Sequence, residues 1–124
     1  MSCYFIAQIQ IHDEDEYRKY LDSVDEVFSK FNGKYLAVDE NPVVLEGEWT
    51  YSRVIIISFP NENELKSWYE SKEYQSIVQH RLKAAKCDTL LVKGRDWSTN
   101  TIYFYTMCLF PVTESVIKIK YENS

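Results

Sequence analysis

Three side chains in this sequence could act together on a small molecule: Glu46, Tyr74 and Arg81. Glu46 follows the apolar residues 43–45 and precedes Gly47, so its carboxylate could enter a space shielded from water. A desolvated carboxylate has a raised pKa and can act as a general acid or base. An arginine can hold an anion through parallel hydrogen bonds, and a tyrosine hydroxyl can orient it. We expect Glu46 as the catalytic residue, with Arg81 and Tyr74 binding the ligand.

A structural interpretation of Glu46 stays open beside the catalytic one. The carboxylate could end a strand and pair with Arg53 or Arg81 to hold a hairpin together. Arg81 lies on the apolar stripe of its helix, which favours an inward position. His80 is adjacent, points about 100° away on a helix, and is expected to face solvent.

Two aromatic residues of the sequence, Trp68 and Tyr69, are further candidates for ligand binding. They lie three and four positions after Leu65, so the three residues share one helix face. Large aromatic side chains dominate core burial, and the face is interpreted first as core. A ligand bound inside the domain would still contact both rings.

Motifs for several other kinds of chemistry are missing from the sequence. The three cysteines and two histidines lack the spacing of a metal site, and the three glycines are too dispersed to form a phosphate-binding loop. No Ser-His-Asp arrangement or dinucleotide fingerprint is present. We therefore expect no metal and no cofactor.

Composition points to one small globular protein. The chain has 124 residues, of which 45% are hydrophobic and 27% charged, and its net charge of −5 comes without a basic run. Nucleic acid is therefore not an expected partner. The longest apolar run, residues 101–112, is too short to span a bilayer. With no signal peptide visible at the start, we expect a cytoplasmic protein with reduced thiols and no membrane partner.

The hydrophobic periodicity predicts a β-α-β-β-α-β order, typical of ferredoxin-like α+β folds with a four-stranded antiparallel sheet. Asp13 and Glu16 form a capping box, and Gly33 is expected to cap the end of that helix. The predicted strands are 3–11, 34–40, 51–59 and 87–94, and the extended structure of the second strand is expected to resume at 43–49 after Asn41-Pro42 interrupts it. The first helix is predicted between Asp13 and Gly33, and the second helical segment opens at 61–70 and restarts at Ser71 through about Ala85.

The strand at 54–59 is apolar on both faces, although the helices can cover only one face of the sheet. A second copy of the chain is the economical cover, so we expect a homodimer that packs sheet against sheet. The domain is expected to span residues 1–94. Residues 95–124 form a C-terminal extension, interpreted as a β-hairpin that is added to the sheet or exchanged with the partner.

Several segments together resemble the domain of unknown function 1330 family over about residues 3–94. They read YFIAQIQIHDEDEYRKY, NGKYLA, VVLEGEW, RVIIISFPN, SWYESKEYQSI and LLVKG, in this order. The resemblance implies a dimeric α/β barrel, a group that includes cofactor-free monooxygenases, lactone isomerases and stress-response proteins. The expected function is binding of a small organic molecule between helices and sheet, with cofactor-free acid/base chemistry. The alternative is a non-catalytic dimerisation or stress-associated module.

Overall fold

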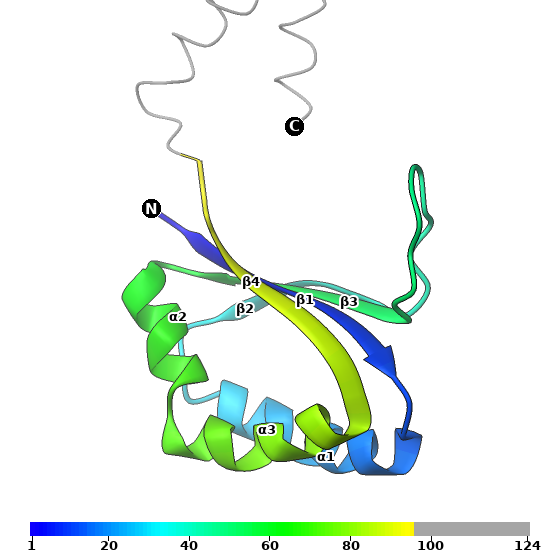
Figure 1. Cartoon of the computed structure of the whole chain (residues 1–124). Helices are drawn as coiled ribbons and strands as arrows, with labels where there is room; N and C mark the ends of the chain where they lie inside the picture. The colour runs from blue at the N-terminus through cyan, green and yellow to red at the C-terminus, as the bar shows by residue number, and fades with distance from the viewer. Residues whose placement is uncertain (96–124) are drawn as a thin grey trace, which may run out of the picture. The chain divides into compact units, whose positions relative to one another are not determined.

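The computed structural model describes residues 1–95, which form a four-stranded antiparallel sheet with three helices packed on one face (Figure 1). The spatial strand order is β2-β3-β1-β4. This is the predicted ferredoxin-like α+β arrangement, with the second helical segment divided at Ser71. The extension expected at 95–124 lies outside the described residues, apart from Arg95. The elements are β1 Cys3–Ile11, α1 Glu14–Phe28, β2 Lys34–Asp39, β3 Arg53–Phe59, α2 Glu62–Tyr69, α3 Lys72–Ala84 and β4 Ala85–Lys93.

The core lies between the sheet and the helices. Alternate residues of β1 and β3 are buried, as the period of two in their sequences predicts. Trp68 on α2 is 1% exposed and forms the centre of an aromatic cluster. Its indole lies with ring centroids 4.3–6.0 Å from those of Phe5, Phe28, Phe59, Tyr69 and Tyr74. The interpretation of Trp68 as a core residue is therefore confirmed.

The predicted start of α1 is confirmed, but its predicted end is wrong. The Asp13 carboxylate accepts a hydrogen bond of 3.1 Å from the Glu16 amide, which satisfies a free helix donor. The helix then ends at Phe28, before Gly33. Gly33 serves close packing instead, because a Cβ atom there would lie 2.5 Å from the Phe28 ring and 2.7 Å from the Phe59 ring.

The strand predicted at 43–49 is also wrong, because these residues belong to a loop between β2 and β3. Pro42 lacks an amide donor for strand pairing, and Gly47 has a φ of +87°, a conformation that suits glycine. Val43 and Leu45 are 84% and 90% exposed. The apolar run that suggested a strand therefore lies on the surface of the subunit.

The face of the sheet opposite the helices is uncovered in the subunit. Ile6 pairs with Ile56 on one side and Leu90 on the other, so three apolar side chains adjoin there. Ile6 and Ile56 are half-buried, and Leu90 is 61% exposed. The loop between β2 and β3 projects on this same side of the sheet (Figure 1).

Candidate functional site

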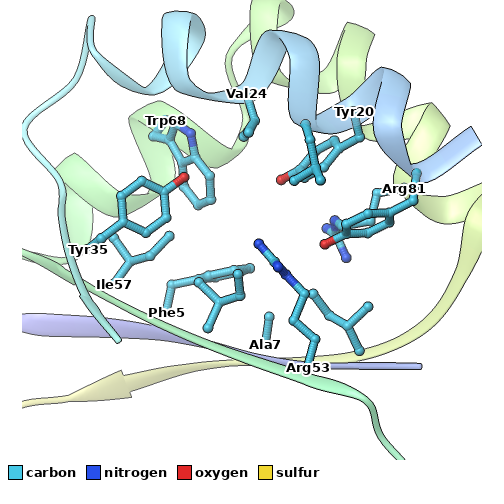
Figure 2. A pocket seen from close by; sticks show the side chains of 13 residues that line it. Phe5, Ala7, Tyr20, Val24, Tyr35, Arg53, Ile57, Trp68 and Arg81 are labelled. Atoms are coloured by element: carbon cyan, nitrogen blue, oxygen red, sulfur yellow. The ribbon is translucent and has the colours of Figure 1, made fainter. Parts of the chain in front are cut away.

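A small cavity of about 30 Å³, here called the inner cavity, lies between the sheet and the helices (Figure 2). Its lining side chains are apolar or aromatic, apart from two arginines. Three of the aromatic side chains are tyrosines, which carry a polar hydroxyl. A space of this size holds about one water molecule. The lining residues are Phe5, Ala7, Ile9, Tyr17, Tyr20, Leu21, Val24, Tyr35, Arg53, Ile55, Ile57, Trp68 and Arg81.

A larger open space of about 410 Å³, here called the outer hollow, adjoins the inner cavity beside α1 and β2. Four residues line both spaces, namely Leu21, Val24, Tyr35 and Arg53. The remaining lining residues of the outer hollow are Asp25 and Val38. Ligand pockets usually measure roughly 300–1,000 Å³. The outer hollow is therefore large enough for the body of a small molecule, and it shares part of its lining with the inner cavity.

Arg53 enters the site from the first position of β3. It is in phase with the buried residues Ile55 and Ile57, which places its side chain on the helix side of the sheet. Figure 2 shows its guanidinium reaching from the sheet into the space below the helices. The guanidinium carbon lies 5.8 Å from the centre of the Tyr17 ring, and Nη1 contacts the Glu40 carboxylate. Arg53 is 8% exposed, so a cation is held within the domain.

Arg81 enters from α3 and is 3% exposed. Its guanidinium carbon lies 5.8 Å from the centre of the Tyr20 ring, and Nη2 donates to the Tyr74 hydroxyl over 3.5 Å. Burial opposes the charge, but the nearby Tyr74 and Tyr20 phenols outweigh that effect and the pKa of Arg81 is raised. Within residues 1–95, no carboxylate forms an ion pair with it.

The phenols around the cavity keep their protons at neutral pH. Burial raises the pKa of Tyr17, Tyr20 and Tyr74, and it raises the pKa of Tyr35 to about 12. The Tyr20 and Tyr74 hydroxyls share a hydrogen bond of 2.8 Å. The tyrosines can therefore donate O–H hydrogen bonds to a ligand, and they are poor bases.

Three residues of the inner cavity have a buried polar atom without a hydrogen-bond partner in the described part of the chain. The atoms are the Tyr17 hydroxyl, the Trp68 Nε1 and the Arg53 Nε. Arginine and tryptophan nitrogens can only donate, so at least two of these groups require acceptors. A molecule that carries acceptor oxygens would satisfy them.

The structure brings together part of the predicted site. Arg81 and Trp68 line the inner cavity, and Tyr74 contacts Arg81 through its hydroxyl. Tyr69 lies instead in a separate groove of about 220 Å³ beside α2 and β4. Glu46 is exposed in the loop between β2 and β3 and does not line either space of the candidate site.

Sequence reasoning missed Arg53 and the tyrosines Tyr17, Tyr20 and Tyr35 as site residues. Arg53 had a usable signal, because it continues the alternation of the buried face of β3. Tyr17 and Tyr20 lie on the apolar face of α1, and apolar spacing does not distinguish a core tyrosine from one beside a cavity. No signal in the sequence indicated that Glu40 would contact Arg53. Glu40 comes directly after β2, where the strand alternation no longer indicates the direction of a side chain.

Two other features of the described residues bear on function. His80 is half-buried, and its Nδ1 lies 2.6 Å from the Glu16 carboxylate on the outer surface of the helices. Among residues 1–95, no cluster of three or more His, Cys, Asp or Glu side chains could hold a metal ion. In the same part of the chain, no helix has the length and apolar character needed to cross a membrane.

The fold and the cavity between its helices and sheet define a ferredoxin-like domain with an internal cavity. The chain belongs to the domain of unknown function 1330 (DUF1330) family, whose model matches residues 2–95. The predicted resemblance is thereby confirmed. No curated protein matches the sequence significantly.

Solved structures share the fold at low sequence identity. A protein of unknown function from Rhodopseudomonas palustris is 16% identical with a TM-score of 0.64, over 77% of this chain and 83% of that one. A dimeric ferredoxin-like protein of unknown function from Jannaschia sp. CCS1 is 9% identical with a TM-score of 0.63, over 76% of this chain and 100% of that one. The cofactor-independent oxygenase SnoaB from Streptomyces nogalater is 11% identical with a TM-score of 0.56, over 79% and 97% of the two chains.

Proposed function

We propose that this protein is a homodimer that binds a small organic molecule between the helices and the sheet of each subunit. The observation that carries the binding is the set of buried donors without partners around the inner cavity, at Tyr17, Arg53 and Trp68. Each unsatisfied buried donor costs about 1–3 kcal/mol. Retaining several of them around one space is typical of a binding site, because a ligand supplies the missing acceptors.

The homodimer is supported by two apolar surfaces of the subunit, the open sheet face at Ile6 and the exposed residues Val43 and Leu45 of the loop between β2 and β3, which projects on the same side of the sheet. One partner subunit could cover both. The Jannaschia structure, which shares the fold, is described as dimeric. A non-catalytic dimerisation module is the alternative, and it would need no ligand in the cavity.

Cofactor-free chemistry is a further step of the proposal. SnoaB is a cofactor-independent oxygenase on a similar fold. The tyrosine and arginine donors of the cavity could stabilise negative charge that develops on a bound oxygen atom. No carboxylate or imidazole is among the residues that line the inner cavity in the described structure. Glu46, in the exposed loop, stays a prediction as the acid or base.

The binding proposal is tested by thermal-shift screening of the full chain against neutral and charged aromatic and alicyclic compounds, followed by titration calorimetry of those that raise the melting temperature. Val24→Trp would fill the space shared by the inner cavity and the outer hollow, and Leu82→Trp on the exposed outer side of α3 is the matched control. We expect binding to the parent and the control but not to Val24→Trp. Binding that survives in a folded Val24→Trp variant, or a complete screen without binding, would overturn the proposal.

A further inference from the structure

We infer that the ligand of this site is a small apolar monocarboxylic acid, whose carboxylate replaces Glu40 as the partner of Arg53. This inference rests on the ligand-binding function proposed above. It is carried by the charges around the site, by the contact between Arg53 and Glu40, and by the shape of the two adjoining spaces.

The charges that line the inner cavity are positive. Arg53 and Arg81 are both buried, and arginine stays protonated at every ordinary pH. Buried charges are usually paired, because removing a charge from water is costly. The only ion pair that either arginine forms within residues 1–95 is the contact of Arg53 with Glu40. An anion in the cavity would therefore be held by two cations that lack a buried carboxylate partner.

Glu40 is a weakly held partner of Arg53. The Glu40 side chain is 73% exposed, whereas that of Arg53 is 10% exposed. Glu40 directly follows β2 and begins the loop to β3, so its carboxylate can turn into water while Arg53 stays in place. Water around the exposed carboxylate screens its attraction to the arginine. A ligand carboxylate can displace Glu40 at small cost.

The guanidinium N–H donors of Arg53 can bind the oxygens of a ligand carboxylate. Glu40 contacts Nη1, and Nε has no partner in the described residues. A carboxylate has two oxygens and can accept parallel N–H bonds from Nη1 and Nη2 together, which is a strong and specific contact that uses the Nη1 position held by Glu40. A neutral carbonyl presents one oxygen and would leave one of these donors unsatisfied.

The remaining surroundings define the body of the acid. Leu21, Val24 and Tyr35 line both spaces, so an aromatic or branched apolar group would extend from Arg53 into the outer hollow. Asp25 lines the outer hollow and carries a negative charge. A second carboxylate at the far end of the ligand would lie near Asp25 and be repelled. The site should therefore prefer acids with one carboxylate.

The inference is tested by calorimetry at constant ionic strength with benzoate, 2-naphthoate, their neutral amides, and the diacid terephthalate. We expect the monocarboxylates to bind at least ten-fold more tightly than the amides and the diacid. Glu40→Gln removes the competing carboxylate from an exposed position, so the variant should fold and bind 2-naphthoate about two- to five-fold more tightly. Glu48→Gln removes an exposed charge from the same loop and should leave the affinity unchanged.

The outcomes separate this inference from the function on which it rests. Neutral compounds that bind as tightly as the acids, or a Glu40→Gln affinity equal to that of the parent, would overturn the carboxylate exchange and leave the ligand site standing. A Glu48→Gln variant that tightens binding as much as Glu40→Gln would also overturn it, because the effect would then come from net charge alone. If neither acids nor neutral compounds bind, both proposals fail.

Discussion

Tyr20 on α1 and Tyr74 on α3 share a hydrogen bond of 2.8 Å between their hydroxyl oxygens, and their rings meet edge to face. Arg81 donates to the Tyr74 oxygen, which favours Tyr74 as the donor to Tyr20. The Tyr20 hydroxyl hydrogen is then free for the inner cavity, which Tyr20 lines. The hydroxyls of Tyr20 and Tyr74 therefore join α1 and α3 beside the inner cavity.

Tyr74→Phe should lower the free energy of unfolding by about 1–3 kcal/mol, because the Tyr20 hydroxyl and the Arg81 guanidinium each lose a buried partner. Equilibrium unfolding in urea measures the loss. Tyr69→Phe is the control, since Tyr69 is half-buried and its hydroxyl makes no hydrogen bond within the described residues. Equal losses in the two variants would contradict the role of the tyrosine pair.

Stability should fall steeply at alkaline pH. The folded-state pKa values of Tyr17, Tyr20, Tyr35 and Tyr74 are raised above the ordinary value of 10.0, chiefly by burial. Below pH 10 both states are protonated and the stabilisation is fully present. Above pH 10 the unfolded chain releases these protons first, so the unfolding free energy decreases as pH rises toward 12. Equilibrium unfolding at several pH values measures the change in the unfolding free energy. Ultraviolet absorbance of the folded protein follows the ionisation of its tyrosines. Tyrosines that all titrate near pH 10 in the folded protein would contradict it.

Leu90→Lys should convert the proposed dimer to a monomer. Leu90 is 61% exposed in the subunit, so a lysine there is tolerated by the fold but not by an apolar sheet-to-sheet interface. Light scattering should give about twice the 14.7 kDa chain mass for the parent and one chain mass for the variant. Leu82→Lys, at an exposed position of α3, should stay dimeric. A parent protein that is monomeric at micromolar concentration would exclude this interface.

Glu46→Gln separates the two interpretations of Glu46. The side chain is exposed and forms no ion pair within residues 1–95, so the unfolding free energy should change by no more than about 0.5 kcal/mol. Ligand affinity should also stay unchanged, because Glu46 does not line the site in the subunit. A loss of turnover with affinity retained would support the acid/base role, and a large loss of stability would support a structural role.

Gly33→Ala should destabilise the domain by about 1–3 kcal/mol, because the added methyl group overlaps the Phe28 and Phe59 rings in the core. Lys30→Ala is a suitable comparison, since Lys30 is exposed just after the end of α1. Thermal and urea unfolding of both variants measure the difference. A Gly33→Ala protein as stable as the parent would show that the rings move aside without cost.

The sequence predicts the elements that have strong local signals. The alternation in β1 and the Asp13 cap of α1 depend on neighbours within a few residues, and both are confirmed. The run at 43–45 was misread because strand formation also needs a pairing partner, and β2 and β3 pair with each other without it. The buried position of Arg81 followed from its helix stripe. The contact between Arg53 and Glu40 joins the two ends of the loop between β2 and β3, and residue spacing alone does not reveal it.

The junction of α3 and β4 also predicts where related sequences can change in length. The helix ends at Ala84 and the strand begins at Ala85 with no residue between them, and the Ala84 carbonyl accepts hydrogen bonds from the amides of both His12 and Asp13. One inserted residue there would either shift the register of β4 against β1 or rotate α3 and turn Arg81 away from the cavity. Across the family, insertions and deletions should therefore accumulate in the loop at 40–52 and be rare between positions 81 and 87.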